Sequence, residues 1–373
     1  MPTATTLPGS RAGGAVAFTH RSFDDHEQVL YCNDPSVGMQ AIIAIHDTSL
    51  GPAAGGCRMQ PYTSVDDALD DVLRLSQGMT YKNAMAGLPL GGGKCVVIAD
   101  PGAEHKPDLL RSFAAHVQTL GGRFWTAIDV GVGPADAEIL AERCDYIFAN
   151  ASRYPAGFNP SSYTALGGFR SIQAAATHVW GSDDLTGRRV AVQGLGAAGG
   201  GLARHLAEAG AKLVVADVRR DHAAAFADEL GGTAVEPDEI LAQPVDIFAP
   251  CALGAILNPD SIGDLQAEIV CGLANNQLSE PGVGQALADA SITYVPDYVA
   301  NGGGMVAAGA LIYSEPTETE TLAKIDGIGD TVLEILRAAD GRRLPPSDVA
   351  DEIAIERVRA ARPAGRITPT RGT

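Results

Sequence analysis

The sequence lacks the patterns that mark several large classes of protein. Its six cysteines include no CxxC pair and its eight histidines include no HxxxH or HxH pair, so a metal site built on thiolates or histidines has no support. No segment approaches the ~20 apolar residues of a membrane span, and the N-terminus has neither the basic nor the apolar region of a signal peptide. We therefore expect a cytoplasmic protein without a bound metal or a membrane anchor.

Positive charge is also scarce in this chain. It has 27 Lys and Arg residues against 45 Asp and Glu residues, a formal net charge of -18 at pH 7. Nucleic acids and acidic membrane surfaces attract basic patches, so this balance argues against both as partners. With 373 residues, 46% of them hydrophobic, the chain is long enough for two domains that each bury a core. Flexibility is expected only in roughly the first fifteen residues and after Arg362.

Two lysines in the first half of the chain have unusual neighbours. Lys82 stands among Met79, Tyr81 and an alanine-rich run, and Lys94 lies between three glycines and the apolar residues 95–98. An ammonium group in apolar surroundings must find a partner or lose its proton, so such a lysine can serve as a general base. The alternative is structural, with one lysine closing a helix and the other ending in solvent before a strand.

The first half predicts a mixed α/β domain. Alternating apolar residues at 18–45 indicate a β-meander, and a helical pattern at 64–78 closes at its glycine, which would place Lys82 just beyond that helix. Asp129 follows a predicted strand and precedes a glycine loop, so it could reach a cleft, although a capping or turn aspartate is an equal alternative. The remaining predicted elements are buried strands at 96–98 and 124–128 and a helix at 108–120.

The second half predicts a Rossmann-type domain. Residues 152–162 are rich in Ser, Pro, Gly and Asn and mark the boundary between the domains. A strand at 189–193, a helix at 202–209 and a strand at 212–217 follow, and a GxGxxG turn lies between the first strand and the helix. The residues of that turn, which we expect to bind a dinucleotide, are Gly194, Gly196, Ala197, Ala198 and Gly199.

The dinucleotide turn predicts NAD as the cofactor. Its glycines let the backbone approach a pyrophosphate, and the N-terminus of the following helix stabilises the negative charge. Asp217 can accept hydrogen bonds from the adenosine ribose and would repel a 2′-phosphate, which favours NAD over NADP. Arg219 and Arg220 argue weakly in the other direction, because a basic residue just past this position can accommodate the phosphate.

Later strands lead to loops that should border the nicotinamide. Predicted strands at 246–249 and 269–271 are followed by loops of small or amide residues, which contain Cys251, Ala252 and Asn275. Two helices are expected at the end of the chain, at 323–338 and 346–361, and the last could return to the first domain.

Taken in order, these motifs resemble the amino-acid dehydrogenases that act on leucine, valine and phenylalanine, within the Glu/Leu/Phe/Val dehydrogenase superfamily. The resemblance covers nearly the whole chain. The matching segments are 51–56, 78–83, 91–94, 129–131, the dinucleotide turn, 248–252, 275–277 and 296–299.

The resemblance implies a fold and a reaction. The fold would have an N-terminal α/β catalytic and oligomerisation domain at 1–150, which the helix within 346–373 could complete, and an NAD-binding Rossmann domain at 151–345, with a substrate cleft between them. Homo-oligomers are usual in this family. The reaction would be the reversible, NAD-dependent conversion of a hydrophobic L-amino acid to its 2-oxo acid and ammonia.

Site residues follow from the same resemblance. Lys82 would bind the substrate α-carboxylate, Lys94 would activate water as general base, and Asp129 would assist proton transfer at the amino group. Asn275 matches a position that contacts substrate or nicotinamide, and Thr164 matches one at the start of the interdomain helix near the cofactor. The side-chain pocket would be formed near Ala54, Gly55, Met79, Ile128, Met305 and Ala308.

The mostly apolar pocket favours branched-chain aliphatic substrates, with phenylalanine or another aromatic residue as the alternative. Ala54, Ile128 and Ala307 depart from residues common in the family, and one methylene in such a pocket is worth only about 1 to 3 kcal/mol. Two alternatives belong to other classes: a non-catalytic NAD-binding regulatory protein, and a lyase or cyclodeaminase that uses NAD transiently.

Overall fold

The computed structural model describes residues 17–362 apart from 149, 151–153, 155–157, 253, 281 and 315. The expected flexible ends and residues 152, 153 and 155–157 of the predicted linker at 152–162 lie outside the described residues. Packing contacts divide the chain into two units, each described by itself. The first comprises Met1–Thr48, Ala53–Met79 and Gly92–Asn150, and the second comprises Ser49–Pro52, Thr80–Gly91 and Ala151–Thr373.

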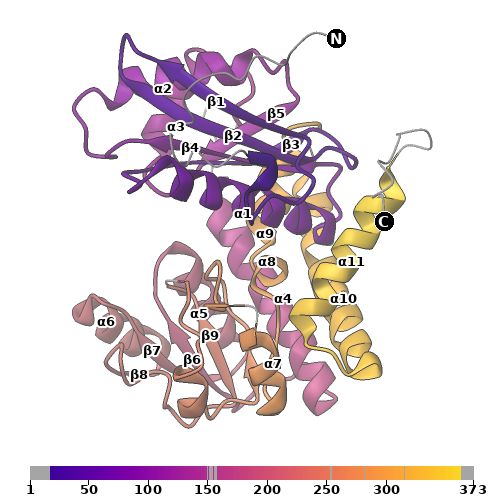
Figure 1. The fold of residues 1–373 in the computed structure, drawn as a ribbon. Coiled ribbons are helices and arrows are strands. Elements are labelled where there is room, and N and C mark those ends of the chain that lie inside the picture. Colours follow the sequence, from indigo (N-terminus) through magenta and orange to yellow (C-terminus); the bar gives the residue numbers. More distant parts are fainter. Residues whose placement is uncertain are drawn as a thin grey trace. The chain divides into compact units, whose positions relative to one another are not determined.

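The first unit contains a five-stranded mixed sheet in the order β1-β2-β4-β3-β5 (Figure 1). The pairs β1–β2 and β2–β4 are antiparallel, whereas β3–β5 is parallel. The meander predicted at 18–45 is confirmed from residue 28 onward as the hairpin of the first two strands, whereas residues 18–27 form no strand. The strands are β1 (Gln28–Asp34), β2 (Met39–Asp47), β3 (Ala53–Gln60), β4 (Gly91–Ile98) and β5 (Phe124–Ile128).

Both faces of this sheet are covered, which explains why β2 and β4 are buried almost throughout. Ile43 and Ile45 of β2 belong to one apolar core, which includes residues of the helices α2 and α3. Ile42 and Ala44 point to the other face and join a second core with the start of α1. The helices are α1 (Val65–Met85), α2 (Lys106–Gln118) and α3 (Pro134–Ala141), preceded by the short 3-10 helix η1 (Ala17–Thr19).

The prediction that the first helix closes at Gly78 is wrong, because α1 continues to Met85 and includes Lys82. A Cβ built at Gly78 has no neighbour within 4 Å, so this glycine lies in open space and neither turns the chain nor allows a close approach. The helix continues because Ala84 and Met85 are buried in the core of the second unit. That burial outweighs the modest helix penalty of one glycine, about 1 kcal/mol.

The second unit contains a six-stranded sheet in the order β11-β10-β9-β6-β7-β8, and every pair is parallel. The chain moves outward from β6 through β7 to β8, then returns to the other side of β6 with β9. This reversal is the switch point at which ligands bind in doubly wound folds. The strands are β6 (Arg189–Gln193), β7 (Lys212–Ala216), β8 (Thr233–Ala234), β9 (Ile247–Pro250), β10 (Ile269–Val270) and β11 (Thr293–Tyr294).

Helices surround this sheet, and α4 lies alongside α10 within the unit (Figure 1). Close helix packing depends on small residues, since a Cβ added at Gly168 of α4 would lie 2.4 Å from a methyl group of Leu273. The helices are α4 (Pro160–Trp180), α5 (Ala197–Glu208), α6 (Arg220–Leu230), α7 (Gly282–Asp289), α8 (Asp297–Ala300), α9 (Gly303–Ala310), α10 (Glu318–Arg342) and α11 (Pro346–Ala361), with the 3-10 helix η3 (Ser261–Asp264).

Three helices of this unit bear on the sequence predictions. Helix α5 starts at Ala197, inside the glycine turn, and not at residue 202 as the apolar pattern predicted. Helix α10 begins earlier than predicted, where a capping box joins Thr317 to Glu320. Helix α11 has the predicted bounds, and the structure groups it with the second unit instead of the first.

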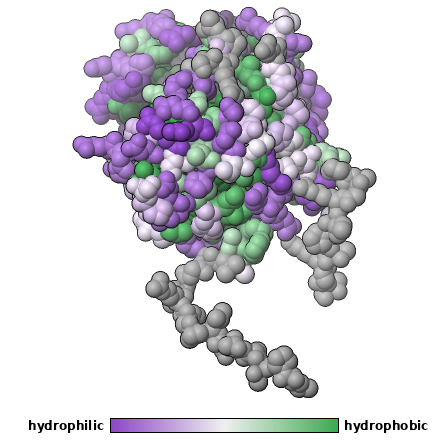
Figure 2. Space-filling view, turned by 90° about the horizontal axis from the view of Figure 1, so that it is seen from above, coloured by the Kyte–Doolittle hydropathy of each residue, from purple (hydrophilic) through white to green (hydrophobic). Residues whose placement is uncertain are grey.

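The surface and the helices agree with the composition. Figure 2 shows one face of the molecule, on which hydrophilic residues form much of the surface with hydrophobic residues between them. Among the described residues, no helix combines the length and the apolar character that a membrane span requires.

Candidate functional site

Lys94 and Asp129 form a close ion pair in the first unit. Lys94 lies on β4 with 7% of its surface exposed, and Asp129 directly follows β5. The Lys94 Nζ and the Asp129 Oδ2 are 2.6 Å apart. Strand β3 separates these two strands in the sheet, and it carries glycine at 55 and 56. A Cβ at Gly56 would lie 2.9 Å from the Asp129 Cβ, so a larger residue there would displace the aspartate.

A second cation, Arg58, contacts the same carboxylate. Its Nε lies 3.3 Å from the Asp129 Oδ2, and its Nη1 donates to both oxygens of Asp71 at 3.1 and 2.9 Å. Tyr62 completes this network by donating its hydroxyl to Asp71 at 2.6 Å. Arg58 was not predicted as a site residue, because the glycine-rich sequence around it gives no strand pattern that would place its side chain.

The two cations set the protonation state of Asp129. Burial alone would raise the pKa of Asp129, but the charge of Lys94, followed by that of Arg58, holds the pKa below its ordinary value. Asp129 is therefore a carboxylate at neutral pH. A carboxylate in contact with a lysine can receive and return the proton of that lysine, which is the exchange required of an acid-base pair.

Two buried cysteines lie near this pair. Cys57 and Cys95 are both buried beside it, and Cys95 lies 3.3 Å from the Thr126 hydroxyl. A hydrogen bond with Cys95, together with burial, raises the pKa of Cys57 well above the ordinary range. The Cys57 thiol held in this form is a poor nucleophile.

Lys82 belongs to the second unit and lies near the end of α1. The positive charge of Lys82 acts on the carboxyl group of Asp297. Burial raises the pKa of Asp297, while the backbone N–H of Gln277 and the charge of Lys82 act in the opposite direction. Asp297 was not predicted as a site residue.

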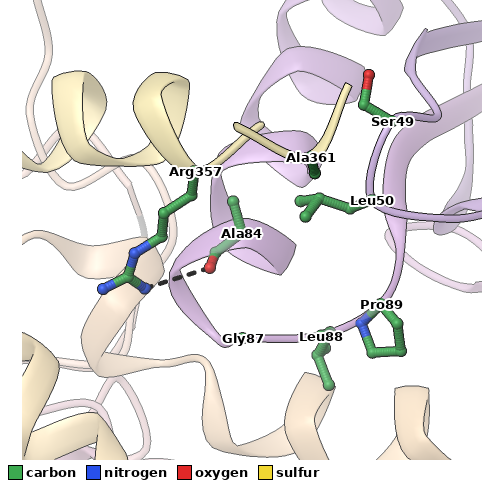
Figure 3. A pocket seen from close by; sticks show the side chains of 8 residues that line it. All are labelled: Ser49, Leu50, Ala84, Gly87, Leu88, Pro89, Arg357 and Ala361. Atoms are coloured by element: carbon green, nitrogen blue, oxygen red, sulfur yellow. Dashed lines mark hydrogen bonds between the residues drawn. The ribbon is translucent and has the colours of Figure 1, made fainter. Parts of the chain in front are cut away.

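The end of α1 is held by α11. Arg357 donates its Nη1 to the carbonyl oxygens of Ala84 and Met85, each at 3.3 Å, which satisfies two of the carbonyls that a helix end leaves unpaired. Figure 3 shows this side chain reaching from α11 towards Ala84. Arg357 and Ala84 also border a pocket of about 470 Å³, and none of its eight lining residues is a predicted site residue.

Asn275 lies in the loop after β10 and is exposed. Its Oδ1 accepts a hydrogen bond from the Asn301 Nδ2 at 2.8 Å, and the same nitrogen donates to the Leu273 carbonyl at 3.3 Å. The backbone N–H of Gln277 donates to Asp297 at 2.8 Å. The loop is thus held at both ends by residues of the segment 297–301.

The dinucleotide turn has the shape that a pyrophosphate requires. Gly194 has a φ of 94°, and a Cβ there would lie 2.7 Å from the Ala252 Cβ. A Cβ at Gly199 would lie 2.1 Å from the Gly194 carbonyl and 2.9 Å from the Cys251 Cβ. A Cβ at Gly196 has no neighbour within 4 Å, so open space faces the N-terminus of α5. The turn therefore fits a phosphate-bearing cofactor.

Asp217 is closely attached to this turn. Its Oδ2 accepts a hydrogen bond from the Leu195 backbone at 2.9 Å, and its Oδ1 accepts from the Arg219 backbone at 2.9 Å and from the Arg219 Nε at 3.2 Å. Burial opposes ionisation, but these N–H groups hold the pKa of Asp217 below its ordinary value. Arg220 forms an ion pair with Glu236 at 2.7 Å. Arg219 and Arg220 thus each have a carboxylate partner.

The predicted pocket residues fall in both units. In the first, Ala54 is buried, Ile128 is 39% exposed, and a Cβ at Gly55 would lie 3.2 Å from the Met79 Cγ. Gly55, Met79 and Ile128 therefore share the unit that holds the Lys94–Asp129 pair. The second unit carries Met305 and Ala308 on α9, together with Thr164 on α4, whose hydroxyl donates to the Pro160 carbonyl at 3.0 Å.

Comparisons with known proteins agree on one family. The model of the Glu/Leu/Phe/Val dehydrogenase dimerisation domain matches residues 26–146, and the Glutamate/Leucine/Phenylalanine/Valine dehydrogenase model matches residues 216–362. The leucine dehydrogenase of Geobacillus stearothermophilus is 44% identical over 93% of this chain and 94% of its own length. The valine dehydrogenase of Streptomyces virginiae is also 44% identical, over 92% of this chain and 96% of its own length.

A solved structure shows the same similarity in three dimensions. The crystal structure of L-tryptophan dehydrogenase from Nostoc punctiforme superimposes with a TM-score of 0.80 and 42% identity, covering 90% of this chain and 97% of the other.

Proposed function

Since the chain belongs to the glutamate/leucine/phenylalanine/valine dehydrogenase family, we propose that it deaminates a branched-chain L-amino acid of the leucine or valine type. The products would be the 2-oxo acid, ammonia and NADH, and the reaction would be reversible. The protein is an amino-acid dehydrogenase, and its relatives among the leucine and valine dehydrogenases match it over most of its length. The observation that carries the proposal is the Lys94–Asp129 contact at 2.6 Å.

The roles proposed for the residues follow the chemistry of that contact. Bound NAD⁺ supplies the acceptor for the hydride that leaves Cα. Lys82 binds the substrate carboxylate, as its positive charge suits. The Lys94–Asp129 pair takes a proton from the water that attacks the iminium carbon, and returns one to the departing nitrogen. Because Arg58 keeps Asp129 ionised, the pair can hold one exchangeable proton through both steps.

NAD is the proposed cofactor, and the open space at Gly196 supports a bound pyrophosphate. Asp217 is ionised and would repel a 2′-phosphate. The arginines that could counter this repulsion are paired with Asp217 and Glu236. We therefore expect NAD to be preferred over NADP.

Branched-chain substrates are favoured over aromatic ones by the relatives and by the residues present. The tryptophan dehydrogenase supports the aromatic alternative, since it is 42% identical to this chain, as is the leucine dehydrogenase of Bacillus subtilis. Gly55, Ala54 and Ala308 are the smallest residues among those proposed for the pocket, and Met79 and Met305 are long and unbranched. Exchanges of this kind change preference by only about 1 to 3 kcal/mol per methylene.

The test is NADH formation with a panel of L-amino acids: Leu, Val, Ile, Phe, Tyr, Trp, Glu and Ala. Turnover confined to the aliphatic members would support the main proposal, and turnover of the aromatic members would support the alternative. Lys94→Ala is the control, which should abolish turnover while NADH still binds. Folded wild-type protein that binds NADH but turns over none of the panel would favour a non-catalytic, regulatory role.

Assembly and location complete the proposal. We infer a homo-oligomer, because the model that matches residues 26–146 is described as a dimerisation domain. Sedimentation of the purified protein tests this inference, and a monomer at micromolar concentration would contradict it. A cytoplasmic location is supported by six free cysteines, five of them buried, as expected in a reducing compartment.

A further inference from the structure

Asn301 lies directly after α8 and is only 5% exposed. Its side-chain nitrogen donates two hydrogen bonds, one to the Leu273 carbonyl and one to the Asn275 side chain. No role follows for it from the sequence, where it is the first residue of a glycine-rich run. Its two bonds nevertheless determine how a proposed ligand-binding residue is oriented.

The orientation follows from the chemistry of amide groups. A backbone carbonyl can only accept, so the atom of Asn301 that faces Leu273 must be the nitrogen. The same nitrogen faces Asn275, so the atom of Asn275 that it meets must be the oxygen. The NH₂ group of Asn275 is then turned away from Asn301, on a residue that is exposed. Asn275 therefore presents its NH₂ donor outward, while its Oδ1 faces Asn301.

The backbone of the loop reinforces this arrangement. Asp297 accepts from the Gln277 backbone at 2.8 Å, and a Cβ at Gly254 would lie 2.7 Å from the Asn275 carbonyl oxygen. Asn276, between Asn275 and Gln277, has a φ of 52°, in the left-handed region where asparagine is one of the few tolerated residues. These contacts hold the backbone of the loop, so the orientation of the Asn275 side-chain amide is left to Asn301.

The arrangement also has a cost. Among the described residues, the Asn301 Oδ1 has no hydrogen-bond partner although it is buried. An unsatisfied buried acceptor is unfavourable, and an apolar residue of similar size would avoid it. The amide is thus better explained by its effect on Asn275 than by a contribution to the stability of the fold.

We propose that Asn301 is a positioning residue, which fixes the Asn275 amide so that its NH₂ group binds an acceptor oxygen of the ligand. That oxygen belongs either to the carboxylate of the amino or 2-oxo acid or to the carboxamide of the nicotinamide. The proposal rests on the proposed function, because it assigns Asn275 to the ligand site.

A double-mutant cycle tests the proposal. Asn275→Ala and Asn301→Ala should each lower kcat/KM about tenfold to a hundredfold, the range expected for one hydrogen bond to a charged or strongly polar group. If Asn301 acts through Asn275, the double variant should be no slower than Asn275→Ala alone. Additive losses would instead show that Asn301 has an independent structural effect, and would overturn the proposal. Unchanged kcat/KM in Asn301→Ala would overturn it as well.

Matched variants separate positioning from folding. Asn258, in the same unit, accepts side-chain hydrogen bonds from the backbone of Asp260 and Ser261 at 3.0 Å. Asn258→Ala should lower the melting temperature without lowering kcat/KM. Asn301→Asp keeps the size of the side chain and removes its donor, so it should lose as much activity as Asn301→Ala.

Two further measurements identify the ligand oxygen and keep the proposal separate from the proposed function. If Asn275→Ala and Asn301→Ala bind the 2-oxo acid more weakly in their NADH complexes, the ligand oxygen belongs to the substrate carboxylate. If they instead bind NADH alone more weakly, it belongs to the nicotinamide carboxamide. A crystal structure of Asn301→Asp requires no turnover. In it, Asn275 should turn its nitrogen towards the new carboxylate, and an unrotated amide would contradict the proposal even if the wild type is an active dehydrogenase.

Discussion

Replacing Arg58 by methionine should reveal how the protein keeps Asp129 ionised. The change removes the contact to Asp129 at 3.3 Å and the two hydrogen bonds to Asp71 at 3.1 and 2.9 Å. Without this cation, the pKa of Asp129 should rise, because burial would be opposed by Lys94 but no longer by Arg58. The acid limb of the pH profile of kcat/KM should therefore move to higher pH.

The partial burial of Arg58 and its two aspartate partners determines how much stability Arg58→Met should lose. Breaking a fully buried ion pair costs about 3 to 5 kcal/mol. The side chains of Arg58, Asp71 and Asp129 are 18%, 25% and 21% exposed, so solvent screens part of the interaction. We expect the free energy of unfolding to fall by about 2 to 3 kcal/mol at neutral pH, after that discount.

The pH dependence of this loss has a definite sign. A carboxylate whose pKa is depressed in the folded state stabilises the fold above its ordinary pKa of 3.8, and that contribution is lost as the pH falls through the folded-state pKa. The difference between wild type and Arg58→Met should therefore be largest near neutral pH and should narrow below about pH 4.

Urea unfolding at several pH values and the pH profile of kcat/KM measure the two effects. Arg21→Met is the matched control, because Arg21 also pairs with an aspartate, Asp70 at 3.1 Å, but is 83% exposed. It should change neither quantity appreciably. The reasoning would be refuted if Arg58→Met left the acid limb in place and destabilised the protein no more than the control does.

Three further variants test other parts of the structure. Gly55→Ala would place a Cβ 1.8 Å from the Gly93 carbonyl oxygen, so β3 must move by more than 1 Å relative to β4, the strand of Lys94. Because this movement misplaces the site, kcat/KM should fall about a hundredfold, and an unchanged kcat/KM would contradict the geometry. Asp217→Ala should narrow the preference for NAD over NADP. It should also weaken NADH binding, since the Leu195 backbone N–H loses its acceptor. An unaltered ratio of kcat/KM with NAD to kcat/KM with NADP would contradict the predicted change in preference. Asp351→Asn removes a carboxyl group whose burial raises its pKa, so unfolding at neutral pH should require as much urea as in the wild type or more, and a clear loss would contradict this.

Much of the second unit could be predicted because its pattern is local. Strands 189–193 and 212–216 agree with the predicted elements within a residue, and the glycine turn between them has the positive φ that its sequence implies. A run of β-branched residues followed by glycines has few alternative structures. The bounds of α11, at 346–361, were predicted for the same reason, since a proline begins it and its apolar residues recur with helical spacing.

The end of α1 was mispredicted because its reason is not local. Gly78 is a weak helix former, and only the burial of Ala84 and Met85 in the second unit makes the helix continue past it. Lys82 consequently lies on a helix near Asp297, more than two hundred residues away in the sequence. No pattern within a short window contains that information.

What the sequence determined by itself was the set of residues proposed to carry the chemistry: Lys94, Asp129 and the dinucleotide turn were named from their neighbours and their order. What only the tertiary structure decided was the partners that tune them. Arg58 reaches Asp129, and Asn301 orients Asn275, through side-chain contacts that strand order and loop closure create. The physical reason is that residue type limits the possible chemistry, whereas a protonation state or an amide orientation depends on atoms within a few ångströms, which only folding brings together.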